Sequence, residues 1–534
     1  MADAIVLVGL SGSGKSTVAA LVASRLGRPL LDLDAEISAR EGAPPAELIE
    51  TRGEAAFRAL EATAVARACA VDGAVIATGG GAVIDPRNRW ALWTAGYVTW
   101  LDAPDPVLLG RLAGHDEARP MLAGDRAERL AGLRTRRERY YRAADSRVDA
   151  AGTSALVAEA VIEAAAAGRP AGRRLFDAQV RRDHPMGPHL ARVVLGTGHD
   201  ATTYDGVLAS TTTGTPVVVA DRRAADALPE LMAALPDGRR LLIASGERRK
   251  RLRTVERLLE DASAMGAERG DAWVGVGGGV TTDMVGTAAA LYVRGAPFVA
   301  VPTSWLGMTD AAIGGKVAVD LSAAKNAAGA FWPPAAIVGD TTVLRTLPRS
   351  RRLDGMAETL KCGIIGDPAL WELVETRGAA ALRHDGADRY ALIDRAVALK
   401  LDVVERDPFE RGERRTLNLG HTLGHALEIE SGYRLGHGLA VVLGLRAVAH
   451  IAAGRGATPG LPERIDSVVH QLGYELTREF DAAAVKRALT TDKKRVRGRQ
   501  RWILPMDIGR VIDVDDVSEA ELDAAIAHIR RGQG

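Results

Sequence analysis

The stretch GLSGSGKS, Gly9 to Ser16, continues the apolar run AIVLVGL that begins at Ala4 and precedes the amphipathic stretch VAALVASRL. It fits G-x-x-x-x-G-K-[ST] in the strand-then-helix context that this motif requires. Glycines let backbone N–H groups wrap phosphates, and a helix N-terminus adds positive potential. Lys15 can reach the β- and γ-phosphates, and the Ser16 hydroxyl can bind Mg²⁺. The stretch predicts a nucleoside-triphosphate site on a parallel α/β sheet.

The pattern around this loop extends the same architecture. Short apolar runs, among them RPLLDLD, GAVIATGG and GYVTWLD, alternate with helical stretches up to about residue 165. This alternation is typical of a parallel sheet. A second α/β segment begins near Arg192, and beyond about residue 346 strands stop and helical periods dominate. We therefore predict an α/β fold with a P-loop domain over 1–167, a linker over 168–190, an α/β domain over 191–345 and a helical domain over 346–534.

Composition excludes several classes of protein. The chain of 534 residues is too long for one core, and 47% apolar with 26% charged residues is typical of globular protein. The net charge of +1 gives no reason to expect nucleic-acid or membrane partners. The apolar run at the start has no basic region before it, which argues against a signal peptide, and no run of eighteen apolar residues predicts a membrane span. Cys69 and Cys362 match no metal-binding or disulfide pattern. We expect a cytoplasmic protein that acts on small molecules.

Further polar residues of the first domain indicate an acceptor site. Asp32 and Asp34, two apart in PLLDLD, are predicted to project on the same side of a strand. One would support Mg²⁺ through water while the other takes a proton from a substrate hydroxyl. A pair of helix-capping aspartates is the alternative. Arg58, Arg119 and Arg136 are further candidates, although each alone fits a solvated surface charge.

Residues 1–165 together resemble shikimate kinase. The pieces GLSGSGKST, LLDLD, GEAAFR, TGGGA, ARPML and RRERYYRAAD occur in that family's order. The resemblance implies that Asp34, Arg58, Gly80 and Arg136 hold shikimate, with Asp34 as the base for the 3-hydroxyl, and that a lid over residues 113–125 carries Arg119. Arg136 is preferred to Arg137 because R-x-x-x-Y-x-x-x-A-D then runs through to Asp145. The implied ATP contacts are Gly12, Ser13, Gly14, Lys15, Ser16, Thr17, Arg111 and Arg119.

The second α/β segment carries a glycine-rich turn and a polar tract. WVGVGGGVTTD, residues 273–283, indicates a strand, a turn that a pyrophosphate can approach, and a helix carrying Asp283. Asp221 closes the strand VVVAD and can accept from a ribose hydroxyl, and GERRK at 246–250 can bracket the adenosine end. A turn without a ligand is the alternative. Polar residues spaced among small ones over 294–334 predict a cleft.

Histidines cluster in NLGHTLGHALEIESGYRLGHG, residues 418–438. By spacing alone His421 and His425 form the expected ligand pair, because residues four apart share a helix face. Glutamate with histidine ligands suits Zn²⁺, and three protein ligands leave a position open for substrate.

Residues 190–534 resemble 3-dehydroquinate synthase, through GVGGGVTTDMVG, VPTSWL, DAAIGGK, KNAAGAFWPP, GMAETLKCGI, RRTLNLGHTLGHALE, GHGLAV and TDKK. The resemblance implies Zn²⁺ or Co²⁺ on Glu358, His421 and His437, with His425 turned to the substrate. The implied substrate and catalytic residues are Arg294, Asp310, Lys316, Asn326, Lys361, Lys400, Arg414, Asn418, His425 and Lys494 or its neighbour Lys493. The implied NAD contacts are Asp221, Glu247, Lys250, Gly278, Gly279, Asp283, Thr303, Ser304, Lys316, Lys325 and Thr346.

The two resemblances imply a bifunctional shikimate-pathway enzyme, with ATP and Mg²⁺ in one half and NAD⁺ and a metal in the other. Its two reactions are not consecutive, and a homodimer through the synthase half is expected. Departures from the family pattern are Ser304 in PTS and the alanines at 311–312. Two alternatives remain: a related sugar-phosphate cyclase for the second half, and an ATP-sensing module without turnover for the first.

Overall fold

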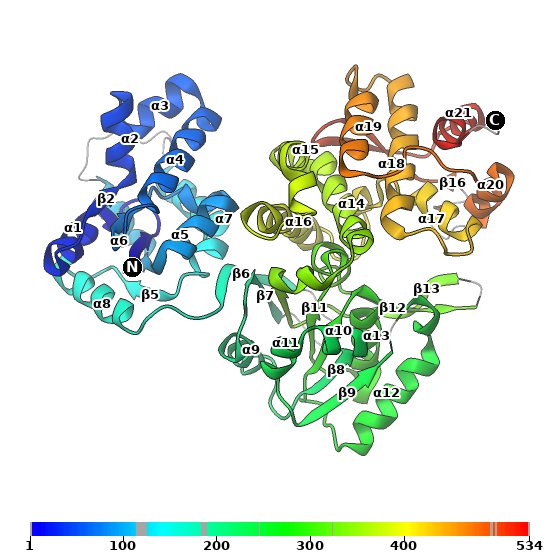
Figure 1. Cartoon of the computed structure of the whole chain (residues 1–534), viewed down its shortest axis with the longest axis horizontal. Helices are drawn as coiled ribbons and strands as arrows, with labels where there is room; N and C mark the ends of the chain where they lie inside the picture. Colours follow the sequence, from blue (N-terminus) through cyan, green and yellow to red (C-terminus); the bar gives the residue numbers. More distant parts are fainter. Residues whose placement is uncertain are drawn as a thin grey trace. The chain divides into compact units, whose positions relative to one another are not determined.

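The computed structural model describes residues 3–113, 125–182, 189–244, 246–322, 324–491, 495–496 and 499–531. These residues form two compact units (Figure 1). The first unit comprises Met1–Gln179 with Val193–Asp200, and the second comprises Val180–Arg192 with Ala201–Gly534.

A five-stranded parallel sheet in the order β2-β3-β1-β4-β5 forms the centre of the first unit. Strands β1 and β4 are buried along their whole length, as expected of parallel strands covered by helices on both faces. The strands are β1 Ala4–Val8, β2 Leu30–Asp32, β3 Val75–Ala77, β4 Gly96–Asp102 and β5 Ser146–Asp149. The helices are α1 Lys15–Leu26, α2 Leu33–Glu41, α3 Pro45–Arg52, α4 Glu54–Ala68, the 3-10 turn η1 Ala82–Ile84, α5 Pro86–Ala95, α6 Asp105–Ala113, α7 Arg126–Tyr141 and α8 Ser154–Ala166. The predicted P-loop α/β domain is confirmed.

A seven-stranded sheet follows, in the order β6-β7-β14-β11-β10-β8-β9, and its strands from β14 to β9 pair in parallel. The strands are β6 Arg173–Arg182, β7 His189–Thr197, β8 Val217–Asp221, β9 Arg239–Ile243, β10 Trp273–Gly277, β11 Phe298–Pro302 and β14 Ala336–Asp340. The helices among them are α9 Ala201–Leu208, α10 Arg222–Ala227, α11 Pro229–Ala233, α12 Leu252–Ala264 and α13 Gly279–Leu291. The short turns are η3 Glu247–Arg249, η4 Tyr292–Arg294, η5 Gly307–Ala311 and η6 Thr341–Thr346, and the separate hairpin is β12 Lys316–Leu321 with β13 Ala324–Phe331.

The expected linker over 168–190 is corrected by this sheet, because Arg173–Arg182 forms strand β6 within it. Phe176, Ala178 and Val180 are buried two residues apart, the spacing of side chains on one face of a strand, and Leu175 and Asp177 on the other face are buried as well. The surrounding Pro, Gly and Arg residues obscured that spacing in the sequence.

Beyond residue 346 the chain is mostly helical, as predicted. The elements are α14 Arg349–Gly366, α15 Pro368–Ala381, α16 Ala387–Arg406, η7 Glu413–Asn418, α17 His421–Glu430, α18 His437–Gly454, α19 Leu461–Leu472, α20 Ala482–Thr491, β15 Arg495–Val496, β16 Arg499–Gln500, β17 Trp502–Asp507, β18 Arg510–Val514 and α21 Glu519–Ile529. The expectation that strands stop at 346 is wrong at the end of the chain, where β17 and β18 form an antiparallel hairpin.

Helix α18 is the one described helix long and apolar enough to cross a membrane. In the structure 72% of it is buried, and it contacts α14, α17, α19 and α21. Its length and apolar composition are those of the core helix of this part of the chain.

Candidate active sites

The P-loop joins β1 to α1 through glycines in left-handed conformations. Gly12 has φ 84° and Gly14, which caps α1, has φ 87°. Lys15 is buried, and its Nζ donates to the carbonyl oxygens of Gly9 and Leu10, both at 2.9 Å. Ser16 lies exposed on the first turn of α1. The ammonium therefore sits inside the loop, where a phosphate group would replace the two carbonyl acceptors.

Arg111 on α6 reaches the same loop. Its guanidinium donates to the oxygen of Gly12 at 3.5 Å and to that of Ala150 at 2.8 Å. These contacts place it beside the predicted nucleotide residues. The lid is predicted over residues 113–125. Its residues 114–124, which include Arg119, lie outside the described residues.

The prediction that Asp32 and Asp34 share one face of a strand is wrong. Strand β2 ends at Asp32 and α2 begins at Leu33, so Asp34 lies in the first helical turn. Asp32 caps this helix, with Oδ1 accepting from the Ala35 amide at 3.1 Å, which is the alternative raised by the sequence. Asp34 nevertheless faces the triple glycine, since a Cβ added at Gly79 would lie 2.7 Å from its Oδ1.

Arg58 is held beside this glycine turn by two acids of its own helix α4. Nη1 donates to Glu61 Oε2 at 2.7 Å and Nη2 donates to Glu54 Oε1 at 3.0 Å. Glu61 is 1% exposed, and its burial raises the carboxyl pKa although Arg58 opposes this. The sequence prediction missed Glu61, although its spacing of three from Arg58 places both on one helix face.

Of the two neighbouring arginines of α7, the structure places Arg137, and not the predicted Arg136, at the glycine turn. Arg137 is buried and its Nη1 donates to the Gly80 oxygen at 3.0 Å, which also accepts from the Tyr141 hydroxyl at 2.6 Å. Arg136 is exposed. Residues 137 and 141 lie one turn apart and face the glycine turn together, so helix phase selects Arg137.

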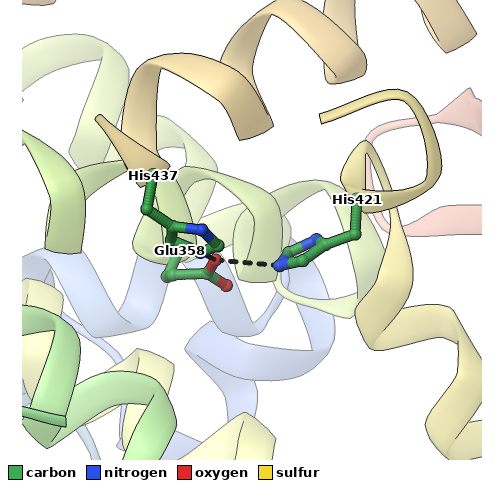
Figure 2. A group of neighbouring side chains, drawn as sticks. All are labelled: Glu358, His421 and His437. Atoms are coloured by element: carbon green, nitrogen blue, oxygen red, sulfur yellow. Dashed lines mark hydrogen bonds and ion pairs between the residues drawn. The ribbon is translucent and has the colours of Figure 1, made fainter. Parts of the chain in front are cut away.

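Glu358, His421 and His437 meet in the second unit, from three different helices (Figure 2). Glu358 Oε1 lies 3.2 Å from His421 Nε2 and 3.1 Å from His437 Nε2, and the three ligand atoms lie within 4.8 Å of one another. His421 Nδ1 contacts the Leu419 oxygen at 3.1 Å, which turns Nε2 towards Glu358. This donor set of one carboxylate and two imidazoles fits Zn²⁺ or Co²⁺.

The electrostatics of Glu358 and His437 favour an ionised carboxylate beside a protonated imidazole, whereas burial lowers the pKa of His421. Burial alone would raise the pKa of Glu358, but Lys361 and His421 hold it well below its usual range. Burial lowers the pKa of His437, yet hydrogen bonds with Glu358 and Glu428 outweigh burial and raise it to about 10. A bound cation would take the place of that proton.

His425 is not a member of this group of ligands. Its ring centroid lies 5.4 Å from that of His421, with the rings nearly perpendicular. The sequence prediction missed Glu428, whose Oε1 lies 3.4 Å from His437 Nδ1. It lies seven residues after His421, two helical turns along α17, a spacing from which it could have been inferred.

Several predicted substrate residues lie around Glu358, His421 and His437, and two of the lysines form ion pairs there. Lys361 pairs with Glu358, and Lys400 pairs with Asp310. Arg414 is buried and donates to the oxygens of Gly314 at 2.6 Å and Pro408 at 2.5 Å. A charged substrate would find these cations already assembled.

Glu410 joins two of the predicted substrate residues although the prediction assigned it no role. Its carboxylate pairs with Lys316 and accepts from Asn418 Nδ2 at 2.7 Å. Its φ of 59° is left-handed, which is uncommon for a residue other than glycine and is found at functional sites. Burial alone would raise the pKa of this carboxyl, but Lys316 and Asn418 hold it below its usual value.

Five of the predicted dinucleotide residues lie at or just beyond the carboxyl ends of β8, β10 and β11, where ligands bind in such sheets: Asp221, Gly278, Gly279, Thr303 and Ser304. Gly278 caps α13, and the Thr303 amide donates to the Gly277 oxygen at 2.8 Å. Asp221 ends β8 and its side chain accepts from the Arg223 amide at 2.8 Å. Ser304 Oγ accepts from the Gly307 amide at 3.1 Å, and Gly279 is the first residue of α13.

Asp283 and its neighbours link this turn to the β12–β13 hairpin. Lys250 Nζ lies 2.5 Å from Asp283 Oδ2 and donates to Asn326 Oδ1 at 2.5 Å. Burial raises the pKa of Asp283 to about 6, despite the ion pair with Lys250. Lys325 of the hairpin pairs with Glu247 at 2.8 Å.

Arg294 and Thr346 each lie at the end of a short turn. Arg294 is exposed at the end of η4, with φ 65°. Thr346 ends η6 and donates its hydroxyl to the Val343 oxygen of the same turn at 2.9 Å. Their roles towards substrate and NAD stay predictions. Lys493 and Lys494 lie outside the described residues, so the choice between them stays open.

The two sites define two classes of enzyme in one chain: a P-loop phosphotransferase, and an α/β–helical enzyme with a turn suited to a dinucleotide and a three-ligand metal site. Family models agree with this division: shikimate kinase matches residues 11–166, 3-dehydroquinate synthase N-terminal matches 240–354, and 3-dehydroquinate synthase C-terminal matches 355–495. A 3-dehydroquinate synthase from Xanthomonas campestris is 39% identical over 313 residues, 57% of this chain and 85% of the relative. The chain belongs to the 3-dehydroquinate synthase family and carries a shikimate kinase domain before it, so it has a kinase half and a lyase half.

Other relatives are named for a different product. A 2-epi-valiolone synthase from Actinosynnema mirum is 34% identical over 330 residues, 58% of this chain and 86% of the relative. The solved structure of a 2-epi-5-epi-valiolone synthase from Streptomyces hygroscopicus subsp. jinggangensis, with NAD⁺ and Zn²⁺ bound, is 29% identical with a TM-score of 0.58 and covers 64% of this chain and 96% of that one.

Proposed function

We propose that this chain phosphorylates shikimate with MgATP and cyclises 3-deoxy-D-arabino-heptulosonate 7-phosphate to 3-dehydroquinate with release of phosphate. The observation that carries the proposal is the pairing of a shikimate kinase domain with a cation-rich metal site of the 3-dehydroquinate synthase family. The two halves point independently to one pathway.

In the kinase half, Lys15 and Arg111 hold the nucleotide at the P-loop. Arg58 and Arg137 flank the triple glycine and bind the shikimate carboxylate, because guanidinium groups match carboxylates by paired hydrogen bonds. Asp34 lies against the same turn and accepts the proton of the attacking hydroxyl.

In the synthase half, bound NAD⁺ supplies reversible hydride acceptance and the metal ion polarises the substrate oxygens. Glu358, His421 and His437 hold the metal, and Lys361 beside Glu358 adds positive charge. Lys316, Lys400 and Arg414 neutralise the carboxylate and phosphate of the substrate, leaving their present acceptors. A plain polyol dehydrogenase would have little use for so many cations. His425 handles a proton beside the metal.

A second candidate is a related cyclase acting on another heptulose phosphate. The 34% identity to a 2-epi-valiolone synthase favours it for the synthase half. The kinase domain favours the heptulosonate, because a valiolone-forming enzyme has no need of a shikimate kinase.

A substrate panel tests the proposal. The heptulosonate phosphate with NAD⁺ should release phosphate without net NADH, and shikimate with MgATP should yield ADP. Steady stoichiometric NADH would indicate a dehydrogenase, and phosphate release only from other heptulose phosphates would establish the second candidate. We further propose a cytoplasmic homodimer through the synthase half, with its dimeric state to be checked by light scattering. Its domains would be the P-loop domain over 1–167, an α/β domain that begins with strand β6 and runs to 345, and a helical domain over 346–534.

A further inference from the structure

A chain of charged side chains connects the dinucleotide residues to the metal ligands. Lys325 Nζ lies 2.8 Å from Glu247 Oε1 and 3.9 Å from Glu428 Oε1. Glu428 Oε1 in turn lies 3.4 Å from Nδ1 of His437, whose Nε2 faces Glu358 at 3.1 Å. One ammonium is thus shared between a predicted cofactor carboxylate and the carboxylate behind a metal ligand.

Lys325 is positioned for this sharing by its surroundings. Its Nζ lies 4.4 Å from the centroid of the Tyr433 ring, a cation–π contact that stabilises the ammonium in this position. Lys325, Glu247 and Tyr433 line a cavity of about 520 Å³, within the range of small-molecule sites. A ligand entering the cavity therefore meets the ammonium directly.

The position of the ammonium affects the metal through Glu428. A carboxylate that accepts from the outer nitrogen of a ligating histidine makes the inner nitrogen a stronger ligand. A cation beside that carboxylate weakens the effect, because it competes for the same negative charge. Glu428 is 5% exposed, so solvent screens this competition only weakly.

We propose that Lys325 couples dinucleotide binding to metal binding. The inference rests on the proposed function, together with the predicted contacts of Glu247 and Lys325 with the dinucleotide. The bound dinucleotide is anionic and draws Lys325 away from Glu428, so Glu428 interacts more strongly with His437 and the metal is held more tightly. By linkage, bound metal raises the affinity for the dinucleotide by the same factor.

The test measures two affinities on the metal-stripped full chain. The Kd of Zn²⁺ is obtained by competition with a chromogenic chelator with and without saturating NAD⁺, and the Kd of NAD⁺ by calorimetry with and without Zn²⁺. We expect Zn²⁺ to bind at least about fivefold more tightly with NAD⁺. In Lys325→Met the two affinities should become independent, within about twofold.

Arg251→Met is the matched control. Arg251 lines the same cavity, and among the described residues its side chain has no ion pair, so this variant should retain the full coupling. Glu428→Gln should weaken Zn²⁺ binding and also lose the coupling. Coupling that persists in Lys325→Met, or that disappears equally in Arg251→Met, overturns the proposal. If wild-type protein binds Zn²⁺ and NAD⁺ independently, the coupling is wrong but the proposed function stands. If it does not bind NAD⁺ at all, the proposed function is wrong and the coupling with it.

Discussion

At the scale of single residues, the two neighbouring arginines of α7 make the sharpest contrast in the kinase half. Arg137→Ala removes a buried guanidinium from the glycine turn, and hydrogen bonds to charged groups contribute about 1.5–3 kcal/mol. The kcat/KM for shikimate should therefore fall about 10- to 100-fold, while Arg136→Ala, on the exposed side, should stay within about twofold. A coupled ADP assay measures both.

Arg137→Lys keeps the charge but not the two-pronged geometry, so it should recover only part of the loss. Equal losses in Arg136→Ala and Arg137→Ala would reject the assignment of the carboxylate to Arg137.

The histidines of α17 differ in a way that metal analysis can detect. His421→Ala removes an imidazole whose Nε2 faces Glu358, so zinc content and phosphate release should both be lost. His425→Ala should retain zinc, because His425 is not among the three ligands, and should lose about 100-fold or more in phosphate release, as expected of a proton-handling group. Zinc lost from His425→Ala would make it a ligand and contradict the assignment.

How far the sequence predicts such residues depends on what determines them. The P-loop follows from a motif in which residue type carries the chemistry. The metal ligands follow only from the resemblance to 3-dehydroquinate synthase, because spacing alone favours His421 with His425, and the structure brings Glu358, His421 and His437 together. Arg136 and Arg137 each have a tyrosine four residues on, so only the packing of α7 against Gly80 distinguishes them. Glu410 could not be assigned a role because its importance lies in a loop conformation that brings Lys316 and Asn418 to one carboxylate.

At the scale of elements, the spacing of α17 and α18 sets the distance between two proposed metal ligands, His421 and His437. The helices cross closely at glycines: a Cβ added at Gly444 would overlap the Gly420 oxygen and lie 2.9 Å from the Gly424 nitrogen. Gly420 itself has φ 75°, a left-handed conformation that begins α17 next to His421. The sequence shows these glycines but not that they face one another.

Gly444→Ala should therefore push α17 away from α18. Overpacking of this kind costs about 1–3 kcal/mol of unfolding free energy, and zinc affinity should fall with it because His421 moves from His437. Gly454→Ala lies in the same helix, where an added Cβ meets nothing within 4 Å, and should leave both quantities unchanged or raise stability slightly. Denaturant unfolding and chelator competition measure the two effects; zinc affinity unchanged in Gly444→Ala would show that the glycine crossing does not position His421.

At the scale of the whole molecule, the question is whether two sites in one chain act independently. The P-loop lies in the first compact unit and the metal triad in the second, each with its own sheet. Their proposed reactions are not consecutive, so the product of one is not the substrate of the other and direct transfer between them is not expected.

Reciprocal inactivation decides this point. Lys15→Ala removes the ammonium that sits inside the P-loop, so ADP formation with shikimate should fall to background while phosphate release from the heptulosonate phosphate keeps its wild-type rate. Glu358→Gln removes the carboxylate shared by both metal-ligand histidines, so phosphate release should be lost with kinase turnover unchanged. Wild-type protein treated with EDTA and then given Mg²⁺ should likewise lose phosphate release and keep kinase turnover, because Mg²⁺ prefers oxygen ligands and does not replace the metal at a site with two imidazoles. Loss of both activities in either variant, with the fold retained by circular dichroism, would show that one half depends on the other and that two independent sites are the wrong description.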